Sequence, residues 1–134
     1  MLSKLINEDQ TGYIKNRFIG FKLRLIQDIT DYEDIYKIEG SLVFIDFIKA
    51  FDSLEWDFML LTLKRFGFNN SFVNWGKTMY TDIQTCVINN GWISEMLRNT
   101  RGNRQICPLS ALLFVLSVEI MALRIRNDKN IKGF

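Results

Sequence analysis

The sequence predicts an α+β or α/β domain in which helices pack on a small sheet with a β-hairpin. Three observations carry this prediction. Apolar residues recur at helical spacing in several segments, one short segment is apolar almost throughout, and an Asn-Gly pair separates two strand-like segments. With 134 residues, of which 48% are apolar, the chain is long enough for a single domain with its own core. The expected order is helix, strand, helix, helix, hairpin and helix.

The first helix is predicted from Arg17 to about Tyr32, followed by a polar loop to Gly40. Its apolar residues fall at steps of three and four, which places them on one helical face: Phe18, Phe21, Leu25 and Ile29.

A strand is predicted from Leu42 to Ile48, because this run is rich in Val, Ile and Phe and short enough for a strand buried on both faces. One carboxylate, Asp46, interrupts it. A buried, unpaired charge is costly, so Asp46 is a candidate functional residue. The alternative is that Asp46 lies at an exposed strand end or pairs with a lysine.

Two helices are predicted after the strand. Asp52 is expected to cap the first, with Glu55 three positions later completing a capping pattern, and the helix should end near Gly67. The second is expected from about Ser71 to Thr81.

A hairpin is predicted next, with residues 83–89 and 92–98 as its arms. Asn90 and Gly91 suit the two positive-φ positions of its turn. Pro108 then fits the first turn of a last helix, expected to run to about Arg126.

Composition excludes several kinds of site. The chain has no His, which excludes Ser–His and Cys–His nucleophile pairs and zinc sites built on imidazole. Its two cysteines, Cys86 and Cys107, indicate neither a zinc cluster nor a disulfide framework. The apolar stretch from Ala111 to Leu123 contains Glu119 and is expected to be too short to span a bilayer, and the N-terminus lacks the apolar core of a signal peptide. We therefore expect a soluble intracellular protein.

The segment before the last helix is basic. No acidic residue lies between Met96 and Val118, whereas Arg98, Arg101 and Arg104 fall close together. The free N–H groups and dipole of a helix N-terminus favour anions, so phosphate is the natural ligand for this loop. The alternative is an ordinary solvated loop.

Four blocks carry a resemblance to a known family. VFIDFIKAFDS, residues 43–53, resembles the first catalytic-carboxylate motif of reverse transcriptases from non-LTR (LINE-type) retrotransposons. RGNRQICPLSALLF, residues 101–114, resembles their next motif, RGxRQGxPLSPxLF. QTGYIKNR, residues 10–17, and the NNG turn, residues 89–91, resemble two further blocks of the family. All four stand in the order and at the spacing of that family.

The resemblance implies a partial palm-and-fingers polymerase fold and an RNA-directed DNA polymerase that uses two metal ions. It implies that Asp46 is the catalytic residue that holds Mg²⁺, a cation that prefers carboxylate oxygens. RNA template, DNA primer and deoxynucleoside triphosphates are the implied partners. The nucleus is the implied location, by analogy alone.

The resemblance also assigns substrate contacts. Phe51 maps to the bulky position that excludes a ribose 2′-OH, with plain core packing as the alternative. Gln105 maps to the residue that touches the incoming nucleotide. Arg101 and Arg104 map near nucleotide or template phosphates, and Arg17 maps to the fingers.

The sequence departs from the family in three respects. Ile106 replaces a Gly, Ala111 replaces a Pro, and no Asp-Asp pair occurs in the chain. We therefore predict a reverse transcriptase fragment that does not polymerise by itself. The alternatives are a nucleic-acid-binding remnant without catalysis and a functionless relic. Because the strand at residues 42–48 would lack a neighbour, we also expect marginal stability.

Overall fold

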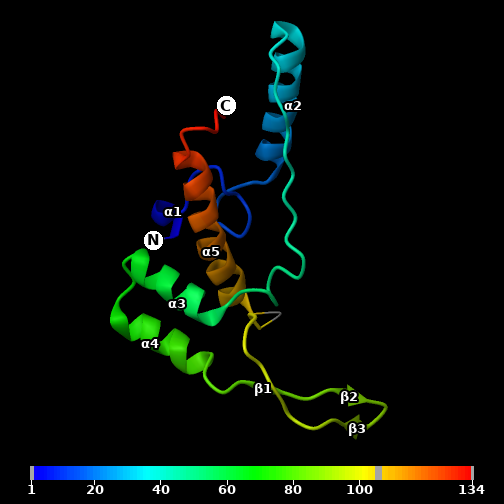
Figure 1. The fold of residues 1–134 in the computed structure, drawn as a ribbon, viewed down its shortest axis with the longest axis vertical. Helices are drawn as coiled ribbons and strands as arrows, with labels where there is room; N and C mark the ends of the chain where they lie inside the picture. Colours follow the sequence, from blue (N-terminus) through cyan, green and yellow to red (C-terminus); the bar gives the residue numbers. More distant parts are fainter. Residues whose placement is uncertain (1, 105–106, 134) are drawn as a thin grey trace. The chain divides into compact units, whose positions relative to one another are not determined.

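The computed structural model describes residues 2–104 and 107–133. The chain divides into two compact units, residues 1–47 and 48–134, and each unit is described by itself. The described residues form helices and short paired strands, which confirms the predicted mixture of α and β structure (Figure 1). That the whole chain forms one polymerase-like domain stays a prediction.

The first unit contains a short helix and a long one. α1 spans Leu2–Leu5 and α2 spans Gly20–Tyr36, so the predicted first helix exists but begins and ends later than expected. α2 ends at Lys37, which has a left-handed φ of 54° and donates its backbone N–H to the Glu33 carbonyl. No residue of α2 is buried. The spacing therefore predicts the helix correctly, although its apolar residue Phe21 is 72% exposed.

Arg17 holds the segment that precedes α2. Its guanidinium group donates to the backbone oxygens of Ser3 and Ile6, both at 3.2 Å, and to those of Asn7 and Gln10. A guanidinium carries several donors in a fixed fork, so one side chain can satisfy all these carbonyl groups. Arg17 thus closes the turns around Ile6, which is 3% exposed.

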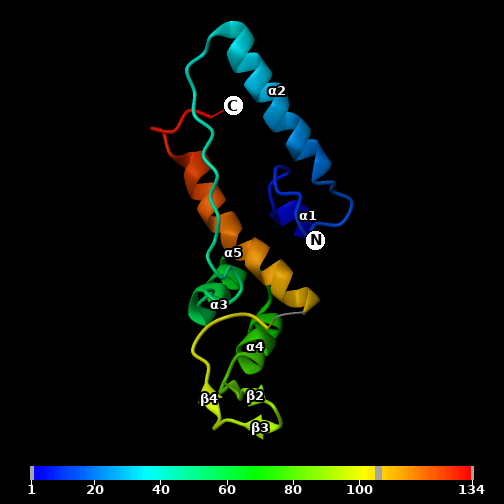
Figure 2. The ribbon, with the colours of Figure 1, turned by 90° about the vertical axis from the view of Figure 1, so that its right-hand side faces the viewer.

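The strand predicted from Leu42 to Ile48 is wrong. Residues 38–47 form an extended segment that pairs with no strand of the described chain, and it leads into a turn at residue 48 (Figure 2). Its apolar side chains are exposed: Val43 and Phe44 to 78% and Ile48 to 84%. The composition favours β structure, but a strand also needs a neighbour to bond its backbone groups, and the described residues offer none.

Three helices form the core of the second unit. α3 spans Trp56–Arg65, α4 spans Asn70–Met79 and α5 spans Pro108–Asn127, and α3 packs against both of the others (Figures 1 and 2). The core side chains come from all three helices: Met59, Leu63, Val73, Leu113 and Leu116. Both helices predicted between residues 52 and 81 are therefore confirmed, as is the last helix.

The two ends of α3 compare differently with the prediction. Gly67, with φ of 77°, follows the helix and confirms the predicted stop. Asp52 does not cap the helix, because Glu55 is the N-cap residue. Asp52 lies instead in a turn in which its N–H donates to the Lys49 carbonyl at 2.9 Å. The sequence contains the residues of a capping pattern, but Asp52 lies in this turn, three residues before the N-cap position.

The predicted hairpin is confirmed. β1 (Gln84–Thr85) pairs with β4 (Leu97–Arg98), and β2 (Ile88–Asn89) pairs with β3 (Trp92–Ile93), both antiparallel. Asn90 and Gly91 have φ of 48° and 82°, as their turn requires. The ribbon projects away from the helices of its unit (Figure 1).

α5 is longer than the apolar stretch that predicts it. Among the described residues, α5 is the one helix whose length and apolar composition would allow it to cross a membrane. The apolar stretch at residues 111–123 accounts for only part of the 20 residues of this helix. A core helix of a soluble protein passes the same test, and buried residues such as Leu113 and Leu116 are compatible with a soluble protein.

Candidate nucleic-acid interface

The basic loop before α5 is bonded to the turn before α3. The Gly102 N–H donates to the Leu54 carbonyl at 2.8 Å, and the Asn103 N–H donates to the Phe51 carbonyl at 2.7 Å. Gly102 has φ of 96°, and a Cβ there would lie 3.1 Å from the Asp52 carbonyl oxygen. The close approach of the two backbones therefore requires glycine at this position. Parts of two sequence blocks, 43–53 and 101–114, meet here.

Asn103 ties the same loop to α5. Its side chain is 5% exposed, and its Nδ2 donates to the Ser110 carbonyl at 3.2 Å. On the other side of the contact, the Phe51 ring lies 5.3 Å from that of Phe114 in α5. This ring contact supports the core-packing alternative for Phe51. Its role against a ribose 2′-OH stays a prediction.

Arg101 and Arg104 lie on the outer side of the loop. Both side chains are exposed, whereas Asn103 between them is buried. In residues 2–104 and 107–133, no ion pair involves either guanidinium group. Arg98 differs, because it pairs with Asp82 at 2.8 Å. The loop therefore presents two unpaired cations beside a fixed backbone.

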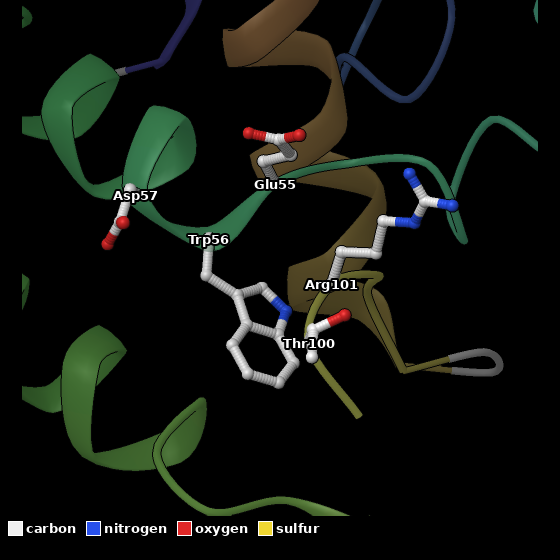
Figure 3. Close-up of a pocket in the computed structure, with 5 residues that line it drawn as sticks. All are labelled: Glu55, Trp56, Asp57, Thr100 and Arg101. Atoms are coloured by element: carbon white, nitrogen blue, oxygen red, sulfur yellow. The ribbon is translucent and has the colours of Figure 1, made fainter. Parts of the chain in front are cut away.

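A cavity of about 400 Å³ opens beside this loop. Glu55, Trp56, Asp57, Thr100 and Arg101 line it. In Figure 3 the indole nitrogen of Trp56 faces the loop, whereas Asp57 points to the opposite side from Arg101. The Trp56 Nε1–H donates to the Gly102 carbonyl at 2.8 Å. The cavity therefore has a guanidinium group on one wall and carboxylates on another.

Cys107 is the N-cap residue of α5 and is partly exposed. The backbone N–H of Ser110, followed by that of Leu109, lowers the pKa of the Cys107 thiol, and the nearby Arg104 charge adds to the effect. Each of these groups favours the thiolate at the start of the helix.

We expect the Cys107 thiol to react with iodoacetamide at a lower pH in the native protein than in urea. The protein for this measurement carries Cys86→Ser, which leaves one thiol. A thiol pKa that is lower in the folded state adds stability above the unfolded pKa of the thiol, and this gain is lost as the pH falls through the folded pKa. The alkylation rate, measured against pH in both states, tests this, and coincident curves would contradict it.

Two of the other predicted site residues, Asp46 and Arg17, belong to the first unit. Asp46 belongs to the exposed segment of the first unit, and Arg17 holds the backbone of that unit. Gln105 lies outside the described residues. No group of three or more Cys, Asp or Glu that could hold a metal ion occurs within the described ranges. The role of Asp46 as a magnesium ligand and the substrate contact of Gln105 therefore stay predictions.

Sequence reasoning missed Trp56 and Asn103. Trp56 is half-buried at the start of α3, and a half-buried indole needs an acceptor for its N–H. That requirement is a signal available from sequence. The acceptor itself, Gly102, lies far along the chain and only the fold brings it near.

Two curated proteins resemble this chain. It is 31% identical over 120 residues to "Transposon TX1 uncharacterized 149 kDa protein" of Xenopus laevis, an alignment that covers 89% of this chain and 9% of that protein. It is 36% identical over 75 residues to "Retrovirus-related Pol polyprotein from type-2 retrotransposable element R2DM" of Drosophila melanogaster, covering 56% of this chain and 7% of that protein. This chain is related to retrotransposon proteins. It spans less than a tenth of the length of these relatives, and no family model matches it.

Proposed function

We propose that this retrotransposon-related chain is a segment of a reverse transcriptase, an RNA-directed DNA polymerase of the LINE type with a partial palm-and-fingers fold. The contact between the two blocks that resemble polymerase motifs carries the proposal. The Gly102 and Asn103 N–H groups of one block bond the carbonyl groups of Leu54 and Phe51 beside the other. These bonds join backbone groups far apart in sequence. They are therefore an observation independent of the charges of Arg101 and Arg104.

In the whole polymerase, Asp46 would be a ligand of catalytic Mg²⁺, and RNA template, DNA primer and deoxynucleoside triphosphates would be the partners. Carboxylate oxygens suit this ion, but one carboxylate cannot hold the two ions that nucleotidyl transfer requires. Among the described residues, Asp46 belongs to no group of three or more Cys, Asp or Glu that could hold a metal ion. The residues in hand therefore do not fit the complete ion site, and no catalytic step is assigned to this chain.

Primer extension tests the polymerase part of the proposal. With an RNA template, a DNA primer and Mg²⁺ or Mn²⁺, the purified chain should give no extended product, because it offers a single carboxylate of the expected set. The Asp46→Asn variant is the matched control. Template-directed synthesis that disappears in this variant would show that the chain is catalytic by itself.

The activity proposed for the chain alone is binding of single-stranded RNA at its basic loop. Arg101 and Arg104 are exposed and unpaired in the described structure, and the backbone that carries them is bonded on both sides. A loop whose backbone is already bonded in place loses less freedom when a phosphate binds. A second, non-catalytic reading of the chain as a nucleic-acid-binding remnant rests on the same observation.

Replacing Arg101 and Arg104 with alanine should weaken RNA binding about tenfold or more at low salt and lower the salt slope by roughly 1.4, because each phosphate contact contributes about 0.7 on a single strand. Lys64→Ala with Lys77→Ala is the control, since both side chains are exposed in the same unit and the change in net charge is equal. Fluorescence anisotropy of labelled oligo(U) across a salt series measures both quantities. Equal losses in the two double variants would argue for diffuse attraction rather than a binding loop.

A further inference from the structure

The Gly102 peptide is held from two directions. Its N–H bonds the Leu54 carbonyl at 2.8 Å, within the turn before α3. Its carbonyl accepts from the Trp56 side chain at 2.8 Å. The backbone bonds attach the loop to the turn, whereas the indole bond fixes which way the carbonyl of residue 102 points.

The indole ring is itself fixed by the helices. Trp56 is the first residue of α3, and its ring centroid lies 5.7 Å from that of Tyr80, the C-cap residue of α4. Tyr80 is 7% exposed, so the ring rests against a buried partner. The Trp56 N–H group therefore connects the packing of α3 and α4 to the position of the loop.

Orientation of the Gly102 peptide matters because Arg101 precedes it directly. With φ of 96°, residue 102 adopts a conformation in which glycine is free to reorient. A change there would turn Arg101, which shares a cavity with the carboxylate of Glu55. A guanidinium that pairs with that carboxylate is no longer available to a phosphate.

We infer that Trp56 is a positioning residue of the RNA-binding loop: its indole N–H holds the Gly102 carbonyl and so fixes the direction in which Arg101 and Arg104 present their charges. This inference rests on the proposed RNA binding and adds a residue that touches no RNA. It makes loop geometry, in addition to charge, a determinant of affinity.

Two substitutions separate the N–H group from the ring. Trp56→Phe keeps an aromatic ring against Tyr80 but removes the donor. Trp56→His keeps a ring nitrogen, Nε2, at the place of the indole nitrogen, but removes the larger ring that packs. Trp75→Phe is the matched control, because Trp75 is 70% exposed on α4 and makes no hydrogen bond with another described side chain or backbone group.

We expect Trp56→Phe to weaken oligo(U) binding three- to tenfold and to speed hydrogen exchange of the Gly102 and Asn103 amides at least tenfold. Trp56→His and Trp75→Phe should bind within twofold of the original chain. A purely structural role for the ring predicts the reverse order, with Trp56→His the weaker binder. That order, or unchanged binding and exchange in Trp56→Phe, would overturn the inference.

Failure of the proposed function has a different signature. If the original chain does not bind oligo(U), or if the Arg101 and Arg104 double variant binds as well as the original, the loop is not the RNA-binding site. Amide exchange is measured without RNA. Faster exchange in Trp56→Phe alone would then still assign the loop geometry to Trp56, and unchanged exchange would reject that as well.

Discussion

Replacing Leu63 with alanine is expected to lower the free energy of unfolding of the second unit by about 2–5 kcal/mol, the usual cost of removing a fully buried leucine side chain. Leu63 is 1% exposed and lies on α3, the helix that packs against both α4 and α5. A Cβ built on Gly76 of α4 would lie 3.9 Å from its Cδ1, which places Leu63 at the contact between α3 and α4. Removal of this side chain leaves a cavity at the contact between α3 and α4.

Leu61→Ala is the matched control for this prediction. It makes the same chemical change on the same helix, but Leu61 is 54% exposed, so its cost should stay within about 0.5 kcal/mol. Urea unfolding followed by circular dichroism at helical wavelengths gives both values. Similar midpoints for the two variants would mean that α3 does not form the centre of a cooperative core.

The elements that sequence predicted well are those specified by a local signal. The Asn90-Gly91 turn has the positive φ values that these residues favour, and it brings together arms that are adjacent in sequence. Gly67 ends α3 in the same way, and Pro108 begins α5. In each case the information lies within a few residues of the structure it determines.

The predictions that failed depend on distant parts of the chain. The extended segment around Val43 and Phe44 has strand composition, but its burial requires a partner that composition cannot supply. The apolar positions of α2 lie at the right spacing, yet none of its residues is buried. Periodicity identifies the helix and not what covers it.

The candidate site shows the same division. The charges of Arg101 and Arg104 were visible in the sequence, and so was the helix start that follows them. The bond from Trp56 to Gly102 joins residues 46 positions apart and was not. The resemblance maps Arg17 to the fingers, which stays a prediction, and the structure shows its guanidinium group bonded to four backbone carbonyl groups of its own unit. A sequence pattern can thus mark a residue as important without saying which groups it binds.

Gly102→Ala is expected to destabilise the second unit and to release the basic loop. A non-glycine residue at φ of 96° is strained by about 1–3 kcal/mol. The new Cβ would also meet the Asp52 carbonyl oxygen at 3.1 Å and the Asp52 Cα at 3.2 Å. Both atoms are backbone, so they cannot swing aside as a side chain can, and the bond from the Gly102 N–H to Leu54 must lengthen. Crowding of this kind adds about 1–3 kcal/mol.

Gly67→Ala separates strain from crowding. Gly67 also has a positive φ, 77°, but nothing lies within 4 Å of a Cβ there. This variant is therefore destabilised by backbone strain alone. Both variants should therefore lose stability in urea unfolding, with the larger loss for Gly102→Ala. Faster amide exchange at residues 102 and 103 should occur in Gly102→Ala only. Equal losses, with exchange unchanged at the loop, would mean that the backbone of residues 101–104 does not press against the turn at Asp52. The loop geometry would then have to come from the Trp56 bond to the Gly102 carbonyl and from α5 through Asn103.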